Sequence, residues 1–175
     1  QEYVLTMNYQ GWDDLLLTST TGYSSYDMDE LCDCDITGGK VFDVDFSEDF
    51  SQFSQEFRLA RQQDDLFFQV GAFYFNEDIN VESSDFDSDT DMKSATTYVD
   101  QQTKSMAVFG HVAYDFSDQM TFTAGLRYTS DDKDLEVIPG AGSGAPPATI
   151  SKDDDYVNFD LSLSYETSEN MMWYG

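Results

Sequence analysis

The residues with the clearest chemistry are carboxylates that recur at every second position near the middle of the chain. In the segment DFDSDTD, the side chains of Asp85, Asp87, Asp89 and Asp91 would share one face of an extended strand, or would surround a cation in a loop. Carboxylate oxygens are the ligands that Ca²⁺ prefers in proteins. Two interpretations stay open: calcium binding by these residues, and a solvated acidic surface suited to a salty medium.

A second acidic stretch, DCDITG at residues 33–38, approaches the calcium-loop spacing D-x-D-x-[DN]-G. It departs from that loop at Thr37, in the third ligand position, and at Val44, where the closing glutamate belongs. Cys32 and Cys34 are separated by one residue, a spacing at which an intramolecular disulfide would be strained and uncommon. Zinc sites usually have about two to four intervening residues and further Cys or His ligands, so this pair predicts no zinc site.

Charge and motif content exclude two broad classes of function. The net charge is −27, from 35 acidic and 8 basic residues, and nucleic-acid phosphates need Lys and Arg partners. No nucleophile motif is present, and the dispersed aspartates form no particular acid–base pair. The protein is therefore predicted not to bind nucleic acid and not to be an enzyme, and no cofactor is expected apart from calcium in the acidic segments.

The elements that must position these side chains are long strands of alternating polarity. Between Thr103 and Thr129, alternate residues are large and apolar while the intervening ones are small or polar, on both sides of a turn at residues 117–119. Long strands of this kind, joined by tight turns, are typical of an antiparallel transmembrane β-barrel, whose apolar face meets lipid. The sequence contains no run of about eighteen apolar residues, so no membrane helix is predicted.

The same alternation predicts about eight strands whose connections are alternately short and long. Short turns are expected at residues 10–14, 62–65, 117–119 and 167–170, and long acidic connections at residues 27–49, 80–98 and 130–154. In outer-membrane barrels the periplasmic turns are short and the extracellular loops are long. We therefore expect the acidic segments to be extracellular loops, and strands of about nine to eleven residues to cross the hydrocarbon layer.

Four stretches of the chain, taken together and in order, carry a family resemblance: FSQEFRLA, LFFQVGAFYFNEDI, KSMAVFGHVAYDFSDQMTFTAGLRYTSDDKD and VNFDLSLSYETSENMMWYG. They cover most of the chain and look like the middle of the barrel domain of TonB-dependent outer-membrane receptors. The resemblance implies that residues 1–175 are part of a barrel of about 22 strands whose lumen is closed by an N-terminal plug domain.

The resemblance also implies a function. A receptor of this family would import a scarce ligand, such as a ferric siderophore, cobalamin or a glycan, across the outer membrane of a Gram-negative bacterium. Its energy would be relayed by the TonB complex through the plug, and its outer surface would contact lipid and lipopolysaccharide. The chain shows no plug-like segment, no TonB-contacting box, no signal peptide and no full terminal strand, so we expect a fragment from mid-barrel.

Four residues are expected on the lumen side of such a wall. Glu56 and Arg58 share the polar face of a strand from Gln52 to about Arg61 and can pair with each other, whereas His111 and Arg127 lie on the polar face of the 103–129 hairpin. They would meet an anionic ligand or the plug, and His111 could ligand iron. The alternative is that they form ion pairs and hydrogen bonds within the wall.

Two other architectures are compatible with the strand pattern. One is a complete small eight-stranded outer-membrane barrel with a structural or adhesive role, which would need its last strand to close the sheet. The other is a secreted acidic β-sandwich that binds calcium or sugar, which would need its apolar faces buried against each other.

Overall fold

The protein folds as one antiparallel sheet of eight strands. The computed structural model describes residues 1–12, 14–34, 43–87, 92–140, 143, 145–168 and 171–175. The strands are β1 (Glu2–Trp12), β2 (Leu15–Asp33), β3 (Asp43–Gln63), β4 (Leu66–Asp87), β5 (Met92–Ser117), β6 (Met120–Pro139), β7 (Ala148–Ser168) and β8 (Met171–Tyr174). Each strand lies beside its sequence neighbours, in the order β1 to β8. The predicted all-β antiparallel architecture is confirmed.

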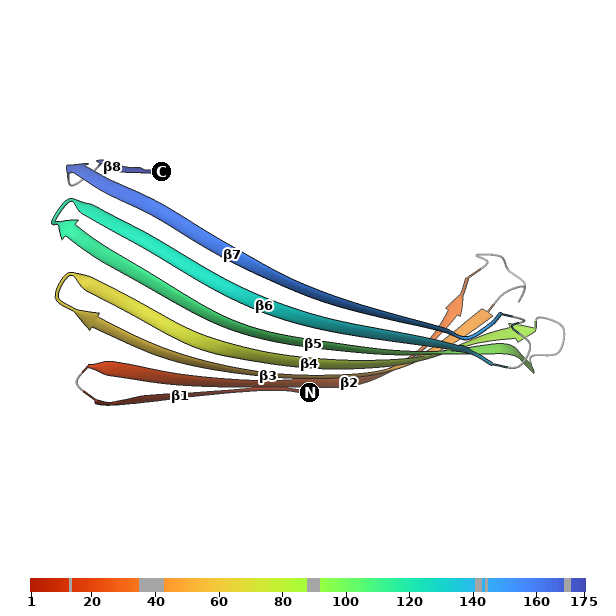
Figure 1. Ribbon diagram of the computed structural model, residues 1–175. Helices are drawn as coiled ribbons and strands as arrows, with labels where there is room; N and C mark the ends of the chain where they lie inside the picture. The colour runs from red at the N-terminus through yellow and green to blue at the C-terminus, as the bar shows by residue number, and fades with distance from the viewer. Residues whose placement is uncertain (13, 35–42, 88–91, 141–142, 144, 169–170) are drawn as a thin grey trace.

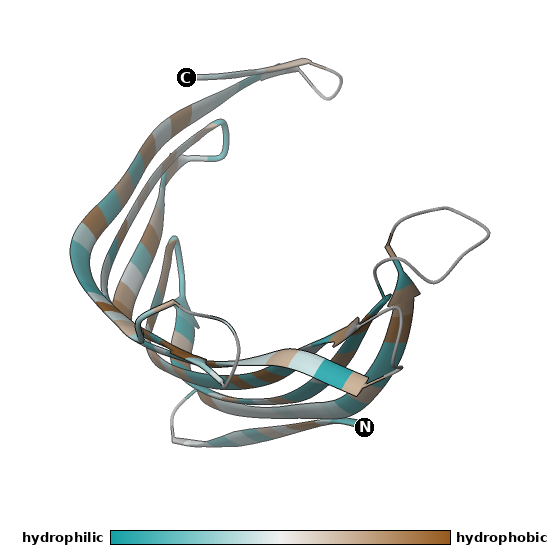
Figure 2. Cartoon of the chain, turned by 90° about the vertical axis from the view of Figure 1, so that its right-hand side faces the viewer, coloured by the Kyte–Doolittle hydropathy of each residue, from teal (hydrophilic) through white to brown (hydrophobic). Residues whose placement is uncertain are grey.

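The sheet curves into an open trough (Figures 1 and 2). Within the described residues, β1 pairs only with β2 and β8 only with β7, so the sheet does not close as a small eight-stranded barrel would require. The described residues include only two buried hydrophobic side chains, Val44 and Ala107. A sandwich would bury one sheet face against another, and this single layer does not. Neither alternative architecture agrees with the structure.

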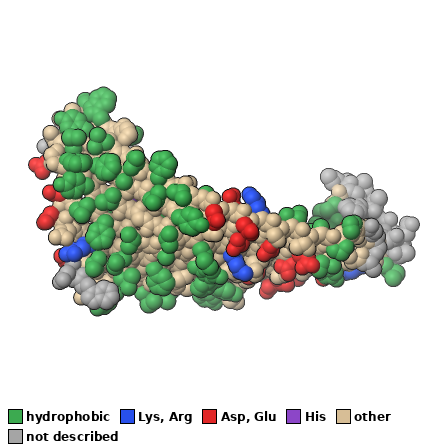
Figure 3. Space-filling model, viewed as in Figure 1, with side chains coloured by type: hydrophobic (Ala, Val, Ile, Leu, Met, Phe, Trp, Pro, Cys, Tyr) green, Lys and Arg blue, Asp and Glu red, His purple; other side chains and the backbone are tan. Residues whose placement is uncertain are grey.

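The cross-strand register separates the side chains into two faces. Phe57, Ala72, Val108, Tyr128 and Val157 lie opposite one another in one continuous row across β3 to β7. This row belongs to the convex face, and side chains one position along each strand belong to the concave face. Figure 3 shows the convex face, on which hydrophobic side chains gather over the half of the sheet nearest the short turns.

We call a group of apolar convex-face residues, many of them exposed, the lipid band. Phe159 is 75% exposed and Leu126 is 58% exposed, which is far more than an apolar side chain usually shows to water in a continuous patch. The band comprises Tyr3, Leu5, Met7, Tyr9, Leu17, Phe57, Leu59, Phe68, Val70, Val108, Val112, Tyr114, Phe122, Leu126, Tyr128, Val157, Phe159, Leu161 and Leu163. The described residues form no helix long and apolar enough to span a membrane.

The strands are longer than the sequence predicted. β2 to β7 contain 19 to 26 residues each, about twice what a bilayer crossing needs. The expectation that residues 27–49, 80–98 and 130–154 are long loops was therefore wrong, because most of these acidic residues continue the ladder. Polar and apolar residues still alternate in these segments, but the polar ones lie on the convex face and the apolar ones on the concave face. Because of this exchange the segments were not predicted as strands.

The two ends of the hairpins compare differently with the sequence prediction. The predicted short turns between β1 and β2 and between β3 and β4 are confirmed, and Asp14 and Asp64 adopt positive φ values of 66° and 49° there. At the opposite end of β2, Cys32 and Cys34 are joined by a disulfide with a Cα–Cα distance of 5.3 Å. A bridge therefore forms here at a spacing that is uncommon for a disulfide.

Candidate functional site

All four residues predicted for the lumen side lie on the concave face. Arg58 on β3 and Arg127 on β6 belong to one cross-strand row, with Gly71 and Phe109 between them. The row containing Glu56 lies on one side of it, and the row containing His111 on the other. The sheet therefore brings residues from three separate strands into three adjacent rows of one surface.

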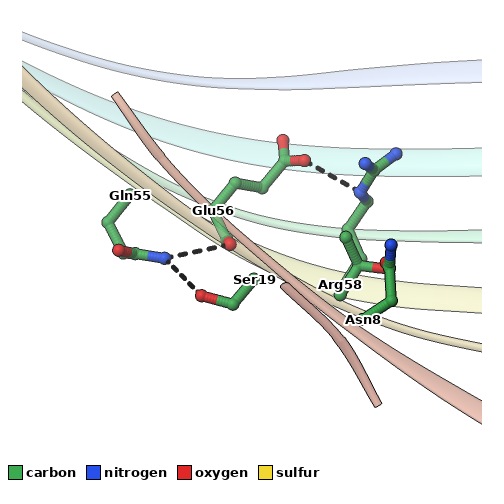
Figure 4. Close-up of polar contacts among 6 residues, drawn as sticks. Asn8, Ser19, Gln55, Glu56 and Arg58 are labelled. Carbon is green, nitrogen blue, oxygen red and sulfur yellow. Dashed lines mark hydrogen bonds and ion pairs between the residues drawn. The ribbon is translucent and has the colours of Figure 1, made fainter. Parts of the chain in front are cut away.

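Glu56 and Arg58 form an ion pair within the wall. Arg58 Nε lies 2.9 Å from Glu56 Oε1, and the two side chains are 41% and 29% exposed (Figure 4). Gln55, one position along β3, points to the other face and donates through Nε2 to Ser19 Oγ at 3.0 Å. The predicted pairing is confirmed, and it leaves Arg58 neutralised by a partner on its own strand.

Arg127 is held by aromatic rings instead of a carboxylate. Its guanidinium carbon lies 5.6 Å from the ring centres of both Phe73 and Phe109, a distance at which the ring faces attract a cation. Its Nε donates to Thr129 Oγ1 at 3.1 Å. Within the described part of the chain, Arg127 takes part in no ion pair.

Two glycines make room for this arrangement. A side chain at Gly71 would overlap the Phe109 ring, so the missing Cβ allows that ring to reach over β4. A side chain at Gly125 would overlap the Asp160 carboxylate, which reaches over β6 in the same way. Neither Phe73, Phe109 nor these glycines was singled out from sequence, because their roles depend on which strands lie side by side.

A hollow beside Arg127 contains further polar groups. It is lined by Phe109, His111, Arg127, Asn158 and Asp160 among others. The His111 ring lies edge-on to Phe67, with ring centres 6.1 Å apart. Guanidinium, imidazole, amide and carboxylate groups at one place can hydrogen-bond an anionic or polar molecule. The described residues contain no cluster of three or more His, Cys, Asp or Glu side chains able to hold a metal ion.

The predicted calcium ligands fall mostly outside the described residues. Asp85 lies on the concave face of β4, opposite Val44 and Ala95. Asp87 ends β4, but its side chain is outside the described part, as are Asp89 and Asp91. Calcium binding by this segment stays a prediction.

The sequence-based assignment missed a second group of concave-face charges farther from the short turns. Lys133 on β6 lies directly opposite Lys152 on β7, and Asp131 lies opposite Asp154 in the adjoining row. These four residues fall in the segment expected to be a loop, so no facing was assigned to them. The available signal was the alternation itself, which continues through residues 130–139 and 148–156.

Comparison with known proteins identifies the fold. The profile described as "TonB dependent receptor-like, beta-barrel" matches residues 1–175, the whole chain. The ferric yersiniabactin uptake receptor FyuA from Yersinia pestis has a similar structure, with a TM-score of 0.83 and 16% identity, over 99% of this chain and 26% of FyuA. No curated protein sequence matches.

Two further solved structures give the same result. The siderophore receptor PiuA from Acinetobacter baumannii has a TM-score of 0.75 and 16% identity, over 99% of this chain and 31% of PiuA. The copper transporter OprC has a TM-score of 0.73 and 13% identity, over 99% of this chain and 28% of OprC. At these identities the likeness concerns the fold alone, and the chain spans less than a third of each of these structures.

Proposed function

Because the chain belongs to the family of TonB-dependent receptor β-barrels, we propose that it forms part of the wall of a receptor that imports a scarce ligand across the outer membrane. Proteins of this family are outer-membrane β-barrels, and this chain has the corresponding location. The observation that carries the proposal is the match of all 175 residues to the barrel profile. Import would draw its energy from the TonB complex, acting through a plug domain.

The two faces of the sheet support a role as a barrel wall. The lipid band gives the convex face the apolar surface that a bilayer requires, and the concave face at the same height contains Arg58, His111 and Arg127. In such a protein the other strands would complete the sheet and satisfy the free backbone groups at β1 and β8, which cannot stay unpaired in lipid. The chain would then contribute transport and recognition, and no catalysis.

The ligand is proposed as a class. Ferric siderophores, cobalamin and glycans are the candidates, and the names of FyuA and PiuA, which refer to ferric yersiniabactin and to siderophores, favour the first. Arg127 would contact an anionic ligand or an acidic residue of the plug, since it is a concave-face arginine without an acidic partner in the described residues. Calcium bound by the acidic hairpin ends would be the only cofactor.

Uptake by the full-length protein tests this proposal. A strain lacking the receptor is compared with the complemented strain for growth or radiolabel uptake on ferric siderophores, cobalamin and glycans, each with and without a functional TonB. We expect one ligand class to depend on both the receptor and TonB. Uptake that depends on neither, for every ligand class, would contradict the proposal.

A further inference from the structure

The polarity of the two faces reverses above the lipid band. On the convex face, toward the hairpin ends farthest from the short turns, the apolar residues give way to carboxylates, which Figure 3 shows beyond the hydrophobic region. These convex carboxylates include Asp27, Asp49, Asp78, Asp100, Asp134 and Glu136. The concave face at the same height is mainly apolar, with Glu48 and Gln101 as polar exceptions. This part of the sheet therefore cannot turn its apolar side to lipid and turns it to the inside of the trough.

We call this concave surface the upper apolar face. One cross-strand row runs over it from β2 to β7 and is apolar except at Gln101 on β5. Tyr26 and Phe50 in that row stack with ring centres 4.8 Å apart. Ile150 is 59% exposed and Tyr26 is 44% exposed, so the surface is open in the described structure. Its members are Tyr26, Met28, Phe50, Ile79, Val81, Val99, Leu135, Val137 and Ile150.

Two lysines border the upper apolar face on its membrane side. Lys133 and Lys152 lie directly opposite each other, next to the row of Leu135 and Ile150. Like charges in this cross-strand position repel. Lys152 Nζ is 3.7 Å from Asp154 Oδ2 and its side chain is 74% exposed, whereas Lys133 takes part in no ion pair within the described residues.

The acidic groups near the lysines lie on the membrane side. Asp131 and Asp154 occupy the next row, and Asp131 Oδ2 accepts a hydrogen bond from the Tyr156 hydroxyl at 3.2 Å. Glu77 shares the row of the lysines but is separated from Lys133 by Thr103. A hollow is lined by both lysines, Thr103 and the two aspartates, among others. An anion arriving from the hairpin ends along β6 and β7 would therefore reach the two ammonium groups before Asp131 and Asp154; Glu48, which lies nearer the hairpin ends on this face, is on β3, three strands from Lys133.

We propose that this junction binds an amphipathic anion, with its apolar or aromatic body on Leu135 and Ile150 and its acidic group between Lys133 and Lys152. Adjacent rows on one face are about 7 Å apart, so a two-ring body and a carboxylate attached to it span the junction. A bound carboxylate relieves the repulsion between the lysines, and burial of the body removes apolar surface from water. This inference rests on the proposed import function and specifies the chemical class of the ligand that the barrel wall binds.

Binding of 2-naphthoate to the purified full-length protein in lipid nanodiscs tests the site. We expect 2-naphthoate to bind at least tenfold more tightly than 2-naphthylmethylammonium, which has the same body and the opposite charge, or acetate, which has no body. K133Q/K152Q should weaken 2-naphthoate at least tenfold, and L135N/I150N should weaken it with both lysines in place. K104Q, which removes one lysine from the convex face of β5, is the matched control and should leave binding unchanged.

Unchanged binding in K133Q/K152Q would overturn the inference. An equal loss in K104Q would do so too, because it would indicate a general effect of charge. A second measurement does not depend on the lysine variants folding. I150C should react with a charged maleimide in the full-length protein, and 2-naphthoate should slow that reaction. An unreactive I150C would mean that another part of the receptor covers the face, which also overturns the inference. Neither measurement requires TonB, so failure here is distinguishable from failure of the uptake experiment.

Discussion

Arg127 and Phe109 lie directly opposite each other on β6 and β5, and the guanidinium carbon of Arg127 is 5.6 Å from the centre of the Phe109 ring. The ring can take this position because the neighbouring strand has Gly71 beneath it. A missing side chain on β4 thus makes room for one of the two rings that contact a charge on β6, two strands away. A substitution at Gly71 therefore tests the packing around Arg127 without changing Arg127 itself.

Substitution of Gly71 by alanine is expected to destabilise the barrel. The new Cβ would overlap the Phe109 ring and the Phe57 carbonyl oxygen, and overpacking of this kind costs about 1–3 kcal/mol. Gly110→Ala is the matched control, because a Cβ there would have its nearest contact at 3.8 Å. Urea unfolding of the full-length protein should distinguish the two variants, and equal stabilities would contradict the packing of Phe109 over Gly71.

Removal of the Glu56 charge is expected to have little effect on stability. The Glu56–Arg58 pair is partly exposed and lies within one strand, and such pairs contribute about 0–1 kcal/mol. Glu56→Gln should therefore lower the free energy of unfolding by less than about 1 kcal/mol, and by less still at high salt. A loss above about 2 kcal/mol would mean that Glu56 has a further partner in the complete receptor.

A charge in the lipid band should be costly, and the same charge on the same strand above the band should not. Leu161 and Ser151 both lie on the convex face of β7, ten positions apart, and only Leu161 belongs to the band. Leu161→Arg is expected to cost about 2–4 kcal/mol if it lies near the bilayer midplane, and Ser151→Arg close to zero. Unfolding from lipid vesicles measures both, and similar costs would contradict this position of the membrane.

The Asp27–Asp49 pair should make stability depend on pH. These carboxyl groups lie opposite each other on the convex face, outside the lipid band. The hydrogen bond that protonated Asp49 donates to the Asp27 carboxylate raises the pKa of Asp49 above its ordinary value of 3.8, with desolvation and the charges of Asp27 and Asp29 adding to the shift. Because the raised pKa favours the protonated form in the folded state, the stabilisation is present below 3.8 and is lost as the pH rises through the folded pKa.

Asp27→Asn tests this dependence. An amide at position 27 carries no charge and can donate a hydrogen bond to the Asp49 carboxylate, so the pKa of Asp49 should move back toward its ordinary value of 3.8. We expect the variant to lose less stability than the wild type between pH 4 and pH 7, as measured by urea unfolding at each pH. Identical pH profiles would show that the two carboxyl groups do not share a proton.

The sequence predicted the strands where the polarity pattern was simple. Around Val108 and Leu126, alternating large apolar and small polar residues gave the correct strands and the correct faces. The assignment failed where Asp134 and Glu136 alternate with Leu135 and Val137, because acidic content was taken as a loop signal. In water, a strand can turn its charges outward and its apolar residues inward, which is the reverse of its polarity in lipid.

The candidate site was predictable only in part, for a related reason. Alternation alone placed Glu56, Arg58, His111 and Arg127 on one face, because facing is a local property of each strand. The aromatic support of Arg127 and the opposition of Lys133 and Lys152 depend on register between strands, which a single sequence does not specify.

The length of the strands also determines how the mouth of the trough can deform. β4 and β5 remain paired from Leu66 and Tyr114 as far as Asp87 and Met92, with a single register shift near Asp85. Such a hairpin is stiff along its length, because its base lies in the bilayer and both of its edges are hydrogen-bonded to neighbouring strands. Narrowing or widening of the rim must therefore bend several paired strands together. The hairpins at the rim move as one continuous sheet and not independently of one another.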